Sequence, residues 1–224
     1  MSEDRLADAV TGARAVLFDL DGVLVDSSAV IDRVWRAWAA RHGLAWETVE
    51  PLLPGRRASE TVRLLAPWLD AAAEGAELER IQAADEDGIR ACPGAVQLTE
   101  QLGLPWAIVT SGSRATATAR LRVTGLRIPA VLVTADDVRH GKPDPEGYRQ
   151  AALRLGVEPR HCLVVEDAEV GVRAALAAGA PVAGVAGSGL GSAAGLVDLL
   201  IAGPADLIGL VGSAAPGPLV EESA

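Results

Sequence analysis

The chain has 224 residues, of which 50% are hydrophobic and only 3% aromatic, and its formal net charge is −10. This length suits one large domain, or one domain that carries an insert. The acidic balance argues against nucleic acid as a partner, because phosphate backbones are bound by basic surfaces. A site for an anionic substrate would therefore have to be built locally, from a metal ion, a lysine and backbone amides.

The cysteines and the apolar segments narrow the class of protein further. Cys92 and Cys162 lie far apart, and neither has a Cys-x-x-Cys partner, which argues against a zinc site. No apolar segment is long enough to span a bilayer. We therefore expect a cytoplasmic protein that has no membrane partner, with a monomer as the default oligomeric state.

The first clear element is a short apolar run at residues 15–18, which leads into Asp19, Asp21 and Gly22. Such a run is typical of a buried strand in a parallel sheet. The two aspartates then lie at the carboxyl end of the strand, where open α/β sheets bind ligands, and both can face one crevice. Like charges this close need a cation or a proton between them. Taken alone, the pair is equally compatible with a solvated acidic turn.

Residues 27–92 carry helical patterns and no run typical of a strand. Ser27 and Ser28 can cap a first helix. Its apolar face is predicted from spacings of three and four, at Ile31, Val34, Trp35 and Trp38. We therefore predict a helical cap domain at residues 27–92, inserted between two parts of a core, residues 1–26 and 93–224.

The rest of the chain alternates between apolar runs and helical patterns. The runs cover residues 106–110, 130–134, 162–165, 181–185 and 199–202, and the helical patterns cover residues 95–102, 114–123, 145–156 and 170–178. Alternation of this kind predicts an α/β fold with a doubly wound, Rossmann-like parallel sheet.

Polar residues follow four of the predicted strands. They are Asp19 and Asp21, Thr110 and Ser111, Lys142, and Glu166 with Asp167. Each group alone has an ordinary explanation, such as a helix cap or a surface lysine. Together they are expected to converge at one edge of the sheet. Carboxylates there suit Mg²⁺, while the lysine, a hydroxyl and backbone amides suit a phosphoryl group, so the set indicates phosphoryl transfer.

These motifs resemble those of the haloacid dehalogenase superfamily of phosphohydrolases. The resemblance rests on residues 18–24, 108–112, 141–145 and 165–167, in that order, and it covers nearly the whole chain. The helical insert resembles the cap of the β-phosphoglucomutase-like branch. Finer features are similar to sugar- and polyol-phosphate phosphatases, including hexitol phosphatases and 2-deoxyglucose-6-phosphate phosphatases. Pro54 departs from many of those enzymes, which have His before the Gly of the cap loop.

The resemblance implies roles for the acidic residues. Asp19 would attack phosphorus and form an aspartyl-phosphate, and Asp21 would act as general acid and then as general base. Mg²⁺ would be bound by Asp19, by the backbone carbonyl of Asp21 and by Asp167. Glu166 would bind the ion directly or through water.

The resemblance also implies which residues bind the substrate. Thr110, Ser111 and Lys142 would hold the oxygens of the transferring phosphoryl group. Arg56 and Arg57 lie in the cap loop, where they either contact the substrate or form a solvated basic turn.

We therefore expect a Mg²⁺-dependent phosphatase that hydrolyses a small sugar or polyol phosphate. The alternatives are a β-phosphoglucomutase-like phosphomutase, a phosphoglycolate phosphatase, a dehalogenase and a non-catalytic binding protein on the same fold. Mutases of this branch carry a histidine where this chain has Ile31. Dehalogenases lack the second acidic residue, which is Asp21 here. A non-catalytic relative would lack one of the motif residues, and all are present.

Overall fold

A six-stranded parallel sheet forms the centre of the molecule. The structure is a computed structural model that describes residues 12–187 and 189–210. Within these residues the strand order is β5-β4-β1-β6-β7-β8. The strands are β1 (Ala15–Phe18), β4 (Trp106–Val109), β5 (Val131–Val133), β6 (Cys162–Glu166), β7 (Val182–Val185) and β8 (Leu199–Ile201). Phe18 of the central strand pairs with Ile108 and Val165 on its two sides, which confirms the predicted doubly wound sheet.

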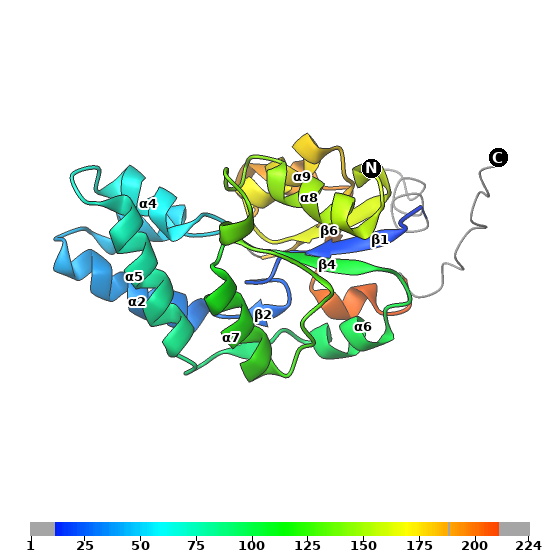
Figure 1. Cartoon of the computed structure of the whole chain (residues 1–224), viewed down its shortest axis with the longest axis horizontal. Helices are drawn as coiled ribbons and strands as arrows, with labels where there is room; N and C mark the ends of the chain where they lie inside the picture. Colours follow the sequence, from blue (N-terminus) through cyan, green and yellow to red (C-terminus); the bar gives the residue numbers. More distant parts are fainter. Residues whose placement is uncertain (1–11, 188, 211–224) are drawn as a thin grey trace.

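Helices cover both faces of the sheet, because the strands are apolar on both faces (Figure 1). The helices of the sheet layers are α6 (Ala95–Gln101), α7 (Arg114–Thr124), α8 (Glu146–Leu155) and α9 (Glu169–Ala178), with short turns η2 (Ala135–Asp137), η3 (Pro159–His161), η4 (Gly191–Gly195) and η5 (Pro204–Leu207). Along β1, Val16 and Phe18 pack with the α6 and α7 side, and Ala15 and Leu17 pack with the α8 and α9 side. Neither face of β1 is left for water.

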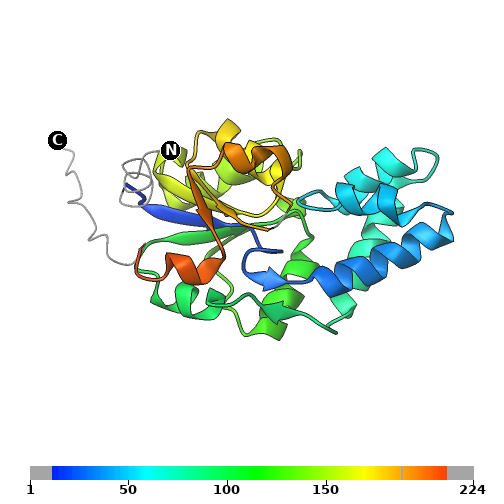
Figure 2. The same cartoon turned by 180° about the vertical axis from the view of Figure 1, so that it is seen from behind.

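A second group of helices lies at one end of the molecule (Figures 1 and 2). This helical block consists of α2 (Ser28–Arg41), α3 (Trp46–Val49), η1 (Glu50–Leu52), α4 (Ala58–Leu65) and α5 (Ala71–Ala84). Trp35 and Trp38 of α2 pack edge to face with 5.3 Å between ring centroids. Gly75 lets α4 and α5 cross closely, since a Cβ there would lie 2.8 Å from Ser59 Cα.

Two short strands carry the chain into and out of the helical block. They are β2 (Val25–Asp26) and β3 (Arg90–Ala91), which pair antiparallel. The expectation that residues 27–92 hold no strand is therefore wrong at β3. A strand of two residues is too short to show an alternating pattern, so it leaves no signal in the sequence. The division into 1–26, 27–92 and 93–224 stays a prediction, and its outermost residues lie outside the described part of the chain.

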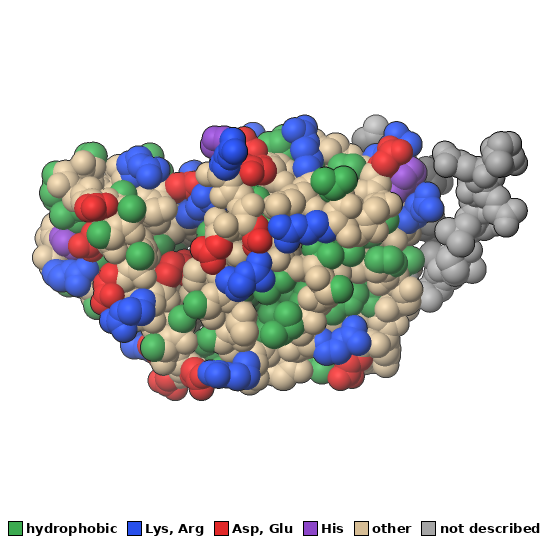
Figure 3. Space-filling view, in the orientation of Figure 1, with side chains coloured by type: hydrophobic (Ala, Val, Ile, Leu, Met, Phe, Trp, Pro, Cys, Tyr) green, Lys and Arg blue, Asp and Glu red, His purple; other side chains and the backbone are tan. Residues whose placement is uncertain are grey.

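The surface carries charges of both signs. On the face shown in Figure 3, Lys and Arg side chains are interspersed with Asp and Glu, and no wide basic area is present there. Among the described residues, no helix is both long and apolar enough to cross a membrane.

Candidate active site

The carboxyl ends of β1 and β6 meet the loop before α8 at a buried ion cluster. Lys142 Nζ donates to Asp19 Oδ1 at 2.7 Å and to Glu166 Oε1 at 2.6 Å. Asp19 is 4% exposed, Lys142 6% and Glu166 0%. One ammonium group thus lies between two carboxyl groups that water scarcely reaches.

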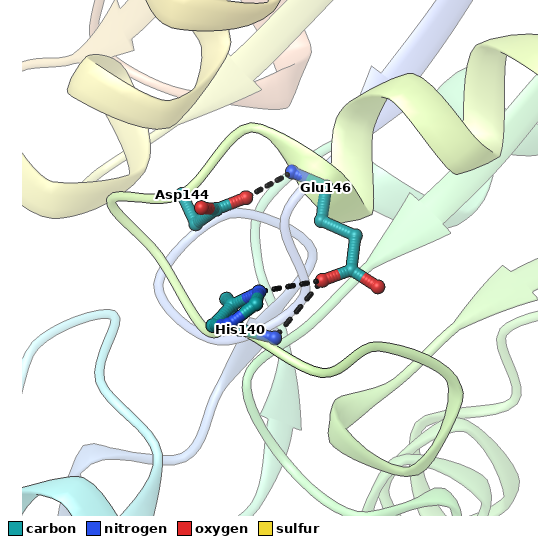
Figure 4. Close-up of side chains that lie close together, drawn as sticks. All are labelled: His140, Asp144 and Glu146. Carbon is teal, nitrogen blue, oxygen red and sulfur yellow. Dashed lines mark hydrogen bonds and ion pairs between the residues drawn. The ribbon is translucent and has the colours of Figure 1, made fainter.

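The loop that carries Lys142 is held in shape by its own side chains (Figure 4). Glu146 accepts hydrogen bonds from the backbone N–H groups of Arg139 at 3.0 Å and His140 at 2.9 Å. Asp144 accepts from the N–H of Glu146 at 2.9 Å. His140, Asp144 and Glu146 have the spacing of possible metal ligands. Because these carboxylates already bind the backbone, we assign them to shaping the lysine loop.

Glu166 is surrounded by hydrogen-bond donors besides the lysine. The Tyr148 hydroxyl donates to Oε1 at 2.6 Å, and the N–H groups of Asp167 and Ala168 donate to Oε2 at 3.0 and 3.1 Å. Gly171 gives the carboxylate its room, since a Cβ at that position would lie 1.7 Å from Oε1. These four hydrogen bonds hold the Glu166 carboxyl group in one orientation.

Fully ionised, the carboxyl groups of Asp19, Glu166 and Asp167 would carry more negative charge than Lys142 offsets. Burial raises the pKa of Asp19 to about 7; Lys142 opposes the rise and Glu166 adds to it. Burial also raises the pKa of Asp167 well above its usual range. Burial lowers the pKa of Lys142, but the neighbouring carboxylates outweigh it, so the pKa lies above its usual value. A further cation would stabilise the ionised form of this cluster.

The residues present fit a hard divalent cation. Carboxylate oxygens of Asp19, Glu166 and Asp167 lie within 4.8 Å of one another. Oxygen-only ligand sets of this kind suit small divalent ions. Gly22 leaves room for the Asp167 carboxyl group, because a Cβ at that position would lie 2.0 Å from Asp167 Oδ2. Its φ of +80° also favours glycine there.

Asp21 contacts a different set of partners. The Ser27 hydroxyl donates to Asp21 Oδ1 at 2.6 Å, and the Arg120 guanidinium pairs with Oδ2. Arg120 also donates to Gln82 Oε1 at 3.0 Å. Ser27 stands at the N-cap position of α2, as expected, but its side chain makes no capping hydrogen bond. Its hydroxyl instead orients a predicted catalytic residue.

Sequence reasoning missed Arg120 and Gln82. Arg120 lies 99 residues from Asp21 and 38 from Gln82, so no local spacing connects them. One signal was available: Arg120 lies in line with Ala117 and Leu121 on the buried face of α7. A charged residue in such a line indicates a buried partner.

The loop after β4 connects the predicted phosphate-binding residues to the helical block. Thr110 is 5% exposed, and its Oγ1 accepts from the N–H of Gly112 at 3.1 Å. The Ser111 hydroxyl donates to the carbonyl of Gly55 at 2.7 Å. The N–H of Ser113 donates to Glu79 of α5 at 2.9 Å. Residues 110–113 are therefore held by hydrogen bonds both to the loop before α4 and to α5.

A cavity of about 320 Å³ lies between the strand ends and the helical block. Its sheet side is lined by Asp19, Asp21, Thr110, Ser111 and Asp167, and its helical side includes Ser28, Ile31, Asp32, Trp35, Glu50 and Arg56. Arg57 is not among the lining residues. Its guanidinium donates to the carbonyls of Val138 at 2.9 Å and Arg139 at 3.2 Å. The structure thus places the predicted site residues around one cavity, except for Lys142 and Glu166 beneath it and Arg57 beside it.

The family follows from this geometry and from the comparison with known proteins. The family profile of haloacid dehalogenase-like hydrolases matches residues 13–179, and the chain belongs to this family of enzymes. The chain is 47% identical over 178 residues to hexitol phosphatase A from Escherichia coli (strain K12), a match that covers 77% of this chain and 82% of that protein.

Two other similar proteins come from different bacteria. Validoxylamine A 7′-phosphate phosphatase from Streptomyces hygroscopicus subsp. limoneus is 38% identical over 175 residues, or 74% of this chain and 82% of that protein. The crystal structure of CbbY from Rhodobacter sphaeroides in complex with phosphate superposes with a TM-score of 0.74 at 27% identity. The superposition covers 87% of this chain and 96% of the CbbY chain.

Proposed function

We propose that this enzyme is a Mg²⁺-dependent phosphatase that hydrolyses a small sugar or polyol phosphate through an aspartyl-phosphate on Asp19. The observation that carries the proposal is the position of Asp19. Asp19 is buried, and its Oδ1 accepts a hydrogen bond from Lys142 Nζ at 2.7 Å. Its carboxyl group lies close to that of Asp167, and it lines the same cavity as Asp21. The names of two similar proteins, a hexitol phosphatase and a validoxylamine phosphate phosphatase, support the same class of substrate.

Asp19, Asp167 and the backbone carbonyl of Asp21 are the residues that would hold Mg²⁺. The ion would offset the negative charge that the attacking carboxylate and the phosphate bring together. Glu166 is expected to support this set without binding the ion directly, since its two oxygens already accept four hydrogen bonds, from Lys142, Tyr148 and two backbone N–H groups.

The first step transfers the phosphoryl group to Asp19. A carboxylate oxygen of Asp19 forms a bond to phosphorus, and the bond from phosphorus to the leaving oxygen breaks. Asp21 gives its proton to that oxygen, which leaves as an alcohol. Lys142 and Thr110, with backbone amides near Ser111, hold the phosphoryl oxygens.

The second step restores the enzyme. Water attacks phosphorus while Asp21 takes a proton from it, and the bond between phosphorus and Asp19 breaks. Phosphate is released and Asp19 is a carboxylate again. Asp21 therefore donates a proton in one step and accepts one in the next.

The cavity supports a polyhydroxylated leaving group. Its volume of about 320 Å³ is that of a small-molecule site. Asp26, Asp32 and Glu50 can accept hydrogen bonds from hydroxyl groups, and Trp35 and Leu53 offer apolar contact to the carbon skeleton. The same carboxylates would repel an acidic leaving group, which disfavours phosphoglycolate.

Ile31 favours hydrolysis over phosphomutase chemistry. It lines the cavity and its aliphatic side chain can neither donate nor accept a proton. A mutase of this branch is expected to carry a histidine at that position.

A panel of phosphate esters tests the proposal. With Mg²⁺ present, phosphate release should be greatest with hexitol and sugar phosphates and much smaller with phosphoglycolate. Replacing Asp19 with Asn should abolish it. Release from phosphoglycolate alone, or interconversion of β-glucose 1-phosphate without phosphate release, would contradict the proposal.

A further inference from the structure

Arg120 is a buried arginine that connects Asp21 to the helical block. It is 2% exposed, and its guanidinium pairs with Asp21 Oδ2 and donates to Gln82 Oε1 at 3.0 Å. Its Nε finds no hydrogen-bond partner among the described residues. Burying a guanidinium is costly unless its partners are well placed. Such a group is hard to explain by packing alone, since an aliphatic side chain could pack in its place.

We propose that Arg120 is a positioning residue for Asp21, which it holds in the orientation needed to protonate the leaving oxygen. The inference rests on the proposed function, in which Asp21 is the general acid. Asp21 is fixed at both oxygens, with Ser27 on Oδ1 and Arg120 on Oδ2. Two anchors set both the rotation and the plane of the carboxyl group. Each oxygen keeps a second lone pair, so the carboxyl group can still face the leaving oxygen across the cavity.

The helical block takes part through Gln82. Gln82 is 5% exposed and lies on α5, and Glu79 one turn before it accepts from Thr116 Oγ1 at 2.6 Å. Thr116 and Arg120 are four residues apart and so lie on the same face of α7. The contacts Thr116–Glu79 and Arg120–Gln82 therefore lie next to each other in the interface between α5 and α7. Gln82 therefore holds Arg120 while Arg120 holds Asp21. The orientation of Asp21 depends in this way on α5 being packed against α7.

The chemistry of the first step gives this role a distinct kinetic signature. When Asp19 attacks phosphorus, the leaving oxygen takes the electron pair of the breaking bond and a proton from Asp21. A hexitol oxygen needs that proton, because an alkoxide is a poor leaving group. A p-nitrophenolate leaves readily without one. A misplaced Asp21 should therefore slow the alkyl ester far more than the aryl ester.

The experiment measures kcat/KM for a hexitol phosphate and for p-nitrophenyl phosphate, with Mg²⁺ present, since kcat/KM reports on the first step. We expect Arg120→Met to lose about 10²-fold on the hexitol phosphate, the lower end of what general acid catalysis contributes. On p-nitrophenyl phosphate the loss should be about tenfold at most, because nitrophenolate leaves without a proton. Asp21→Asn should show the same selectivity, and Gln82→Leu should show it more weakly. Arg122→Met is the matched control, because Arg122 lies on the same helix but is exposed and pairs with Glu86.

Equal losses on both substrates would overturn the proposal and leave Arg120 a structural residue. If Arg120→Met fails to fold, as judged by circular dichroism, Arg120→Lys carries the test. It keeps the charge but loses the planar fork, and the same selective loss is expected. An unchanged ratio of the two kcat/KM values in Arg120→Lys would overturn the proposal while leaving the proposed function intact. A wild-type enzyme that releases phosphate from no sugar or polyol phosphate would overturn the proposed function, and the inference with it.

Discussion

Asp19 is a buried carboxyl group, so we expect its protonation to affect the stability of the fold as well as the proposed reaction. Its pKa of about 7 in the folded protein lies above the ordinary 3.8. The folded state therefore binds this proton more tightly than the unfolded chain. The resulting stabilisation is fully present below the ordinary value and is lost as the pH rises through about 7. In EDTA, we expect the melting temperature of the wild type to fall between about pH 5 and about pH 8, and that of Asp19→Asn to fall less.

Differential scanning fluorimetry measures both proteins across this pH range. Mg²⁺ should restore stability at the upper end, where the carboxyl group is ionised and the cation takes the place of the proton. At the lower end the same concentration of Mg²⁺ should have little effect. Parallel pH profiles for wild type and Asp19→Asn in EDTA would show that Asp19 does not carry the shifted proton.

Gly171 illustrates how closely the site is packed. A Cβ added there would lie 1.7 Å from Glu166 Oε1, so Gly171→Ala must displace the carboxylate that anchors Lys142. We expect destabilisation at the upper end of the ~1–3 kcal/mol typical of overpacking, together with loss of activity. Urea unfolding measures the first and phosphate release the second. Gly103→Ala is the control, because nothing lies within 4 Å of a Cβ there. A Gly171→Ala variant as stable and active as this control would contradict the packing described.

Contacts between α4 and the core should affect substrate binding more than chemistry. Arg57 precedes α4 and bonds to the carbonyls of Val138 and Arg139 without lining the cavity. Arg57→Met should loosen this end of the helical block and raise KM several-fold. Hexitol phosphate and p-nitrophenyl phosphate should be affected alike, in contrast to the selectivity expected for Arg120.

Arg80→Met is the matched control for Arg57→Met, because Arg80 is exposed and pairs with Glu77 within α5. Steady-state kinetics on both esters give the answer. A lowered kcat with an unchanged KM in Arg57→Met would indicate a direct part in the reaction.

The strands of the sheet were predictable because their sequence signal is local. β1, β4 and β6 are apolar runs that end in polar residues, and parallel pairing brings those ends to one edge. β2 and β3 were not predictable, because two residues show no period. Arg120 and Gln82 were not predictable for another reason: their contacts join three segments that only the packing of α5 on α7 brings together.

At the scale of the whole molecule, we expect a cation to offset the negative charge where the edge of the sheet faces the helical block. Four acidic side chains meet at this site: Asp19, Asp21, Glu166 and Asp167. The buried basic side chains that pair with them are Lys142 and Arg120. Chelation with EDTA should stop phosphate release, and added Mg²⁺ should restore it. Activity that persists in excess EDTA would contradict the proposed metal requirement.

Formation of a phosphoryl group on Asp19 can be measured directly. In Asp21→Asn, p-nitrophenyl phosphate should still react once, because its leaving group needs no proton, while hydrolysis of the intermediate should be slow without the general base. Mixing this variant with the ester should release a burst of nitrophenolate equal to the enzyme concentration. Mass spectrometry after acid quenching should locate one phosphoryl group on Asp19. Steady release without a burst, with Asp19 unmodified or another residue phosphorylated, would contradict the mechanism proposed for this enzyme.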